Sequence, residues 1–140
     1  MRVLALDYGS ARCGCAISDP TGVLATPIEP VPNPGSRRGL ARLRALAAEL
    51  GAERVVIGLP LSLSGSDSAQ TAQAREFARR LQGDLPMPVE LYDERLTTRL
   101  AARTGGQASE DSRAAAHLLD SWLEHRSRAD RPCPRGSGDD

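Results

Sequence analysis

Three strand-like segments precede a regular alternation of helix-like and strand-like segments, and this order constrains the fold more than any other feature of the chain. The expected strands cover residues 3–6, 13–18, 24–31, 54–60 and 89–94. The expected helices cover about 40–50, 69–81, 95–103 and 110–126. The first two strands read as a hairpin, and the later strands are each separated by a helix. This order predicts an α/β fold with a mixed sheet and helices on its faces.

Composition limits the classes of function. The chain has 140 residues, which fits one domain, here expected over 1–126 with a disordered tail over 127–140. All 18 basic residues are arginine, so a Walker A loop and a catalytic lysine are excluded. The formal net charge is zero, which argues against a generic nucleic-acid binder but allows a local basic patch. We see no membrane span or signal peptide, and we expect a cytoplasmic protein.

The cysteines do not form a recognisable metal motif. Cys13 and Cys15 lie two apart in an expected strand and therefore share one face, while Cys133 lies in the tail. A Cys-x-Cys pair without a second pair is poor zinc spacing. We interpret Cys13 and Cys15 as small buried apolar residues.

Acidic residues fall at the ends of separate elements. Asp7 ends the first strand, Asp93 and Glu94 end the last, and Asp111 opens the final helix on its apolar face. Each has a structural explanation on its own: a turn, a solvated strand end, or a favourable charge at a helix start. Together they would converge at one end of the sheet. Side-by-side carboxylates are costly to bury without cations, so the pattern indicates divalent ions with oxygen ligands.

Gly58 supports this layout. It ends the strand that we expect between the strands carrying Asp7 and Glu94. The missing side chain would let the two carboxylates lean together across the middle strand. A tight turn before Leu59 and Pro60 explains this glycine equally well.

Four blocks carry a family resemblance: "ALDYGSARCGCAISD", "VVIGLPLSLSGSDSAQTAQAREFARRL", "VELYDERLTT" and "EDSRAAAHLLDSWL". With their spacing they resemble the YqgF (RuvX) family, whose members are described as Holliday junction resolvases or as pre-16S rRNA nucleases. The resemblance covers the chain to about Arg126. It implies an RNase H-like fold: a five-stranded sheet with the first three strands antiparallel, the last two parallel, and helices on both faces.

The resemblance also implies a catalytic and metal-binding set. Asp7, Glu94 and Asp111 are its members, with Asp93 as the fallback for Glu94, and Mg²⁺ or Mn²⁺ in a two-metal site is the implied cofactor. More distantly similar resolvases place their second acid where this chain has Gly58. The segment before Asp111 is also shorter and more acidic than is usual in the family.

Basic residues near the acids are candidate phosphate contacts. Arg95, Arg99 and Arg103 recur every four residues on one expected helix face, and Arg12 follows the first turn. Arginine can bind phosphate in a bidentate manner, although a solvated helix face is an equal alternative. His117 lies two turns from Asp111 and is assigned no catalytic role.

Three functions remain open. The first is a metal-dependent nuclease that processes the 5′ end of pre-16S rRNA during ribosome biogenesis. The second is a resolvase of branched DNA, which needs a symmetric dimer for paired cuts. The third is a non-catalytic nucleic-acid or ribosome-assembly factor. The expected partners are structured RNA or branched DNA and ribosomal precursor particles, with no membrane, for a monomer or homodimer.

Overall fold

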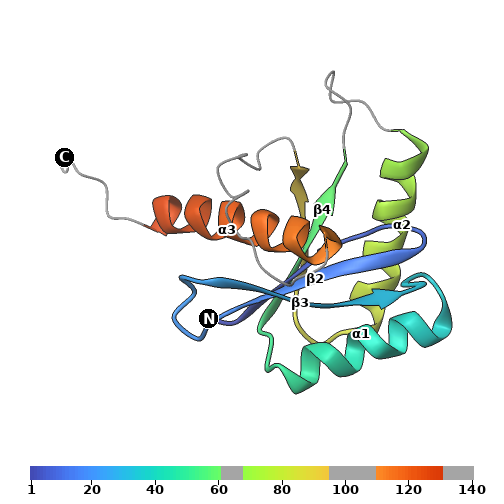
Figure 1. Cartoon of the computed structure of the whole chain (residues 1–140), viewed down its shortest axis with the longest axis horizontal. Helices are drawn as coiled ribbons and strands as arrows, with labels where there is room; N and C mark the ends of the chain where they lie inside the picture. The colour runs from blue at the N-terminus through green and yellow to red at the C-terminus, as the bar shows by residue number, and fades with distance from the viewer. Residues whose placement is uncertain (61–67, 95–109, 131–140) are drawn as a thin grey trace.

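The computed structural model describes residues 1–60, 68–94 and 110–130, with side chains described over 111–126 in the last range. These ranges contain five strands and three helices (Figure 1). The strands are β1 (Val3–Asp7), β2 (Arg12–Ser18), β3 (Ala25–Pro32), β4 (Arg54–Leu59) and β5 (Val89–Asp93). The helices are α1 (Arg37–Glu49), α2 (Ala69–Asp84) and α3 (Glu110–Asp130).

The strands form one mixed sheet in the order β3-β2-β1-β4-β5. β1 pairs antiparallel with β2, and β2 pairs antiparallel with β3. β4 then lies parallel to both β1 and β5. The expected division into three antiparallel and two parallel strands is confirmed. β4 lies between β1 and β5, as the reading of Gly58 required.

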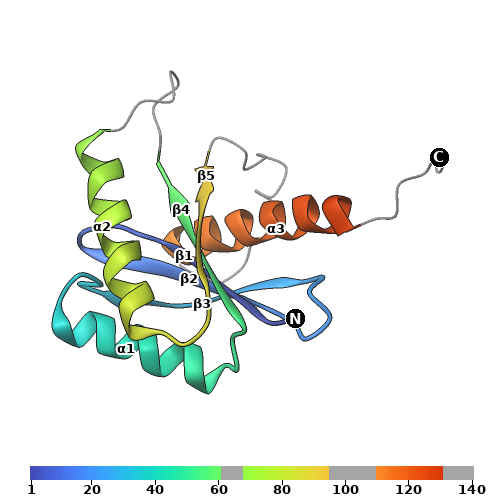
Figure 2. The ribbon, with the colours of Figure 1, turned by 180° about the vertical axis from the view of Figure 1, so that it is seen from behind.

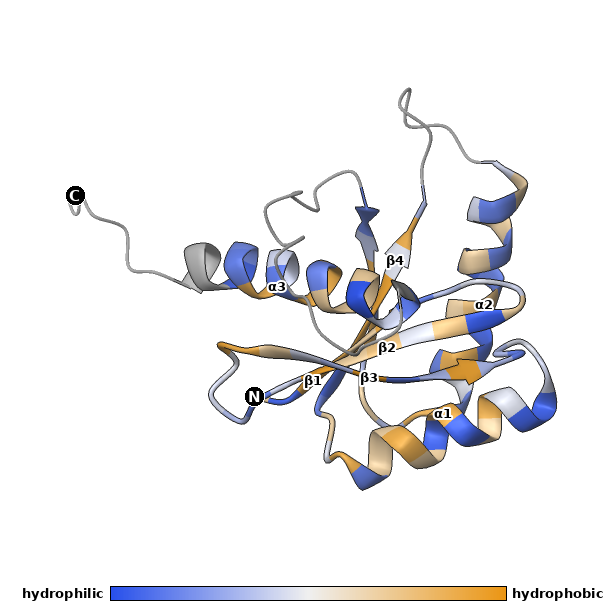
Figure 3. Cartoon of the chain, in the orientation of Figure 1, coloured by the Kyte–Doolittle hydropathy of each residue, from blue (hydrophilic) through white to orange (hydrophobic). Residues whose placement is uncertain are grey.

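Helices cover both faces of the sheet. α3 packs on one face, seen in front in Figure 1, and α1 and α2 pack on the other, seen from behind in Figure 2. The side chains of β1 alternate between the two layers. Leu4 and Leu6 join the core under α1 and α2, whereas Val3 and Ala5 join the core under α3. The apolar residues therefore gather along the sheet, and the outer helix faces are hydrophilic (Figure 3).

The helix boundaries differ modestly from those expected. α1 begins at Arg37 because the Ser36 side chain accepts a hydrogen bond from the Gly39 backbone N–H and caps the first turn. Ser68 caps α2 in the same way through Thr71. α3 continues to Asp130, four residues beyond the expected end, since no glycine or proline interrupts it before Pro132.

The cysteine interpretation agrees with the packing. Cys13 and Cys15 are buried in the same core as Leu4 and Leu6, and neither forms a disulfide. Cys133 lies outside the described residues, as does the expected helix over 95–103. Among the described residues, no helix has the length and apolarity needed to cross a membrane.

Candidate active site

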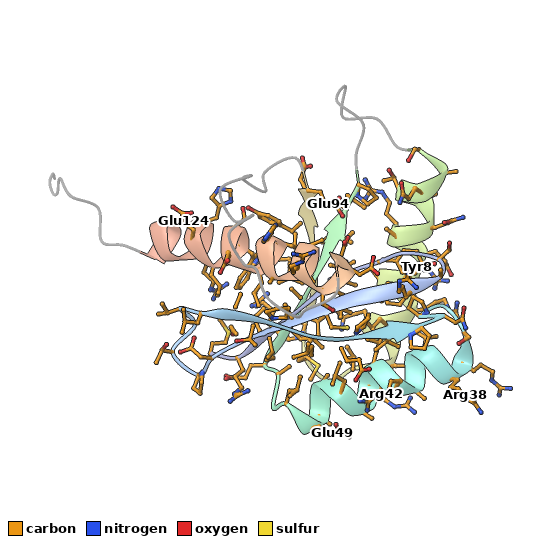
Figure 4. All side chains as sticks on the ribbon, in the orientation of Figure 1. Tyr8, Arg38, Arg42, Glu49, Glu94 and Glu124 are labelled. Carbon is orange, nitrogen blue, oxygen red and sulfur yellow. The ribbon has the colours of Figure 1, made fainter. Side chains whose placement is uncertain are left out.

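Asp7 and Glu94 come together at one edge of the sheet. Asp7 ends β1, and Glu94 directly follows β5. The carboxyl ends of parallel strands meet at the same edge, so β1 and β5, which flank β4, bring both side chains to the carboxyl end of β4. Glu94 lies at the end of β5 above α3 in Figure 4.

Gly58 of β4 provides the space in which Glu94 lies. A Cβ atom built on Gly58 would stand 2.7 Å from Glu94 Oε2 and 3.1 Å from Glu94 Cγ. It would also stand 3.2 Å from Leu118 Cδ2 of α3. Any larger residue at this position would displace the Glu94 side chain. The Leu118 side chain, which lies on the same side, limits where it can move. The structure therefore favours the steric reading of Gly58.

The two carboxyl groups share a hydrogen bond in a largely buried setting. Burial raises the pKa of Asp7 from 3.8 to about 7, with further contributions from the Glu94 charge, the hydrogen bond to Glu94 and the Asp111 charge. Burial also raises the pKa of Glu94, while the hydrogen bond from Asp7 opposes that increase and the Asp93 charge adds to it. The environment of each carboxyl group therefore disfavours its charged form.

Asp111 lies close to this pair but faces a different partner. Its Oδ2 accepts a hydrogen bond from Arg12 Nε at 2.6 Å, and the two side chains are 40% and 62% exposed. Gly14 of β2 allows the first turn of α3 to approach, because a Cβ there would collide with the Asp111 carbonyl oxygen. Among the described residues, no three His, Cys, Asp or Glu side chains form a set that could hold one ion.

A pocket of about 220 Å³ opens beside the two acids. Asp7, Glu94, Ala114, His117 and Leu118 line it. His117 Nε2 is buried and has no hydrogen-bond partner among the described residues. We assigned no role to His117 from the sequence, although its position three residues after Ala114 places both on one face of α3. That spacing is the signal that could have identified it.

Asp93, the fallback acid, ends β5 and does not belong to the lining of this pocket. Glu94 lines this pocket together with Asp7. Of the predicted phosphate contacts, Arg12 lies beside Asp111. Arg95, Arg99 and Arg103 lie outside the described residues.

Hydrogen bonds hold β5 against α3 beneath the pocket. The Tyr92 hydroxyl bonds Ser121 Oγ at 2.9 Å and also His125 Nδ1. Nearby, Trp122 Nε1 donates to Glu90 Oε2 at 3.0 Å. These contacts fix the strand whose end carries Glu94, so α3 supports the site as well as lining it.

A family model described as RuvX, Holliday junction resolvase, matches residues 1–125. The chain belongs to the RuvX family. A Rhodococcus erythropolis protein named "Putative pre-16S rRNA nuclease" is 42% identical over 94% of this chain and 82% of its own length. A Mycobacterium tuberculosis protein with the same name is 44% identical over 97% of this chain and 86% of its own length.

Solved structures support the RNase H-like fold. Thermus thermophilus RuvC in complex with a Holliday junction substrate superposes with a TM-score of 0.66 at 14% identity. The match covers 91% of this chain and 96% of the RuvC chain. A second Thermus thermophilus RuvC structure gives a TM-score of 0.61 at 16% identity, covering 95% of this chain and 100% of the RuvC chain. At these identities the likeness concerns the fold, which agrees with the RNase H-like expectation.

Proposed function

We propose that this RuvX-family chain is a metal-dependent nuclease that hydrolyses phosphodiester bonds, with the 5′ end of pre-16S rRNA as its substrate. The observation that carries the proposal is that Asp7 and Glu94 meet beside one pocket at the carboxyl edge of the sheet, in the space left by Gly58. Ligands of open α/β sheets bind at this edge. The names of the relatives support the choice of substrate.

The donor set fits a hard dication such as Mg²⁺ or Mn²⁺. Carboxylate oxygens are the ligands these ions prefer, and the Asp7 and Glu94 side chains line the same pocket. Asp7 and Glu94 would hold the ion, and Asp111 would join them if its carboxylate left Arg12. When bound, such ions polarise phosphoryl oxygens and lower the pKa of coordinated water. The two-ion arrangement implied by the family is part of this proposal.

The remaining residues would bind and orient the substrate. Arg12, 62% exposed, can exchange Asp111 for a phosphate oxygen. His117 offers an unpartnered ring nitrogen to whatever fills the pocket. Leu118 and Ala114 supply an apolar wall that limits water beside the acids. Arg95, Arg99 and Arg103 remain predicted phosphate contacts.

A Holliday junction is the second candidate substrate. The description of the matching family model and the fold shared with RuvC favour it. It would require a homodimer for symmetric cuts. If the pure chain cleaves neither substrate, the third function, a non-catalytic role in ribosome assembly, replaces the nuclease proposal. Ribosomal precursor particles in the cytoplasm are the setting that the rRNA substrate implies.

Cleavage by the purified chain tests the proposal. A 5′-labelled RNA spanning the precursor and mature 16S junction and a labelled four-way DNA junction are each incubated with Mg²⁺, Mn²⁺ or EDTA. We expect discrete cleavage of the RNA with either metal, and none with EDTA or with the Asp7→Asn variant. Cleavage of the junction alone would replace the rRNA substrate with branched DNA. Cleavage that persists in Asp7→Asn would contradict the site.

A further inference from the structure

The charge of the molecule is unevenly distributed, although its formal total is zero. The two helices on one face, α1 and α2, carry seven arginines against three acidic residues. α3 on the opposite face carries five acidic residues against three arginines. Six of the seven arginines of α1 and α2 matter below: Arg37, Arg38, Arg42, Arg44, Arg79 and Arg80. All six are exposed.

Three of these arginines, Arg37, Arg38 and Arg80, form no ion pair with an acidic residue among the described residues. Arg42 pairs with Glu49 at 3.8 Å, Arg44 with Asp84 at 3.8 Å and Arg79 with Glu76 at 2.5 Å. Arg37 and Arg38, in the first turn of α1, have no corresponding ion pair within that part of the chain. Figure 4 shows Arg38 projecting from the end of α1 that is opposite Glu49. Their charge is therefore available to an external anion.

The first turn of α1 lies at the same edge of the sheet as the candidate active site. β3 runs in the direction of β1, because both are antiparallel to β2. The chain therefore enters α1 at the edge where β1 ends in Asp7. Arg12 pairs with Pro32 at this edge, and Asn33 N–H donates to the Ala11 carbonyl at 2.9 Å. The short turn over 33–36 thus joins Pro32, the strand partner of Arg12, to Arg37.

Arg80 of α2 completes the group. Its Nη1 donates to the Gly35 carbonyl at 2.9 Å, which holds the guanidinium against the turn that precedes α1. The other N–H groups of that guanidinium remain available for further acceptors. Arg37, Arg38 and Arg80 are called the α1-edge arginines below. They come from two helices but meet around one turn.

We propose that the α1-edge arginines bind the phosphate backbone of the nucleic acid on the side of the molecule away from α3, and so hold the segment that flanks the cleaved bond. The inference rests on the proposed function, because it assumes a nucleic-acid substrate. Arginine guanidiniums bind phosphates irrespective of sequence. The aromatic content of only 3% leaves little opportunity for base stacking, so phosphate charge is the feature this surface can recognise.

Equilibrium binding of the full chain tests this surface. A fluorescently labelled RNA hairpin from the 16S precursor end and a labelled four-way DNA junction are titrated in EDTA between 50 and 200 mM salt. We expect the Arg37→Ala/Arg38→Ala double variant to bind both about 10-fold more weakly, with a salt slope smaller by about two. Arg80→Ala should lose a smaller share of the affinity for both ligands.

Arg42→Ala/Arg44→Ala is the matched control. It removes the same charge from the same helix but takes arginines that already have acidic partners. We expect its affinity to stay within about twofold of the wild-type chain. Equal loss in both double variants would overturn the proposal in favour of diffuse charge attraction. Unchanged affinity and salt slope in Arg37→Ala/Arg38→Ala would overturn it as well. Thermal unfolding of every variant excludes misfolding as the cause.

The same experiment separates this surface from the proposed hydrolysis. Loss of binding in Arg37→Ala/Arg38→Ala supports the surface even if the wild-type chain never cleaves RNA. In that case only the nuclease assignment fails. Failure of the wild-type chain to bind either nucleic acid at 50 mM salt would overturn the surface itself.

Discussion

The two faces of the sheet differ in the sign and the exposure of their charged side chains. On the α3 face, Asp7 and Glu94 lie half-buried beside a pocket. On the other face, Arg37 and Arg38 stand exposed without acidic partners among the described residues. The formal net charge of zero does not reveal this separation of acidic and basic residues. The comparison teaches that the half-buried acids and the exposed arginines lie on opposite faces of the sheet, which is the basis for proposing a cation site on one and a phosphate contact on the other.

The difference follows from the cost of desolvation. A buried carboxyl group can avoid that cost by keeping its proton, which is why the pKa of Asp7 rises to about 7. A guanidinium cannot lose its proton in a protein and is therefore placed where water or an anion reaches it.

The largest expected effect is that of Asp7→Asn. The substitution keeps the shape of the side chain but removes a ligand for the cation, so we expect cleavage to fall by at least about 10³-fold. The affinity for the RNA hairpin in EDTA should stay near that of the wild-type chain. Single-turnover cleavage and equilibrium binding measure the two effects. A parallel loss of binding and cleavage would contradict the separation of the two faces.

Gly58→Ala is a steric test of the acid pair. The new Cβ would press on Glu94 Oε2 from 2.7 Å, so Glu94 must move away from Asp7. We expect a loss of cleavage of about 10- to 100-fold, the scale of a displacement near 1 Å in an active site. Kinetics in Mn²⁺, with circular dichroism as a check of the fold, measure this effect.

Gly83→Ala is the matched control, because nothing lies within 4 Å of a Cβ at Gly83 in α2. We expect full activity and a gain in stability of about 0.5 to 1 kcal/mol from helix propensity. If Gly58→Ala cleaves as well as Gly83→Ala, the position of Glu94 does not matter for catalysis.

Stability in the absence of metal should depend on pH through Asp7. The pKa of this carboxyl rises from 3.8 to about 7 on folding, so the folded chain binds the proton more tightly than the unfolded chain does. The stabilisation is complete below about pH 4 and is lost as pH rises through about 7. At pH 8, Asp7→Asn should exceed the wild-type chain in unfolding free energy by on the order of 2 kcal/mol.

Thermal and urea unfolding between pH 4 and pH 8 in EDTA measure this difference. It should shrink toward zero at the acidic end, where the aspartate is protonated in both states. A wild-type chain that gains stability relative to Asp7→Asn as pH rises would show that the carboxyl is compensated without a metal.

Tyr92→Phe gives the smallest expected effect. It removes the hydroxyl that bonds Ser121 and His125 and so weakens the attachment of β5 to α3. We expect a loss of about 1 to 2 kcal/mol in unfolding free energy. Cleavage at saturating Mn²⁺ should change less than in Gly58→Ala, because Gly58 still leaves room for Glu94. Urea unfolding compared with initial rates separates the two effects.

The sequence predicted the fold well because strand and helix periodicities are local. The apolar runs of β1 and β4 and the helical spacing of α1 determine which faces are buried. The placement of Gly58 between the strands that carry Asp7 and Glu94 was also expected from the sequence, whereas the five-stranded topology was implied by the family resemblance.

Side-chain partners could not be predicted in the same way. The ion pair of Arg12 with Asp111 depends on where the first turn of α3 meets β2 at Gly14. The unpartnered nitrogen of His117 and the bond from Arg80 to Gly35 likewise depend on packing between distant segments. Periodicity indicates which face of a helix or strand a residue lies on. It does not identify the residue of another segment that the side chain contacts.

Isothermal titration of the metal-free chain with Mn²⁺ at pH 6.5 tests the central claim most directly. The account predicts that the wild-type chain binds Mn²⁺ with release of a proton, seen as a dependence of the heat on buffer ionisation, and that Asp7→Asn and Glu94→Gln each lose this binding. Arg37→Ala/Arg38→Ala should bind Mn²⁺ as the wild-type chain does. Equal Mn²⁺ affinity in the wild-type chain and in Asp7→Asn would contradict the assignment of the acid pair as a cation site.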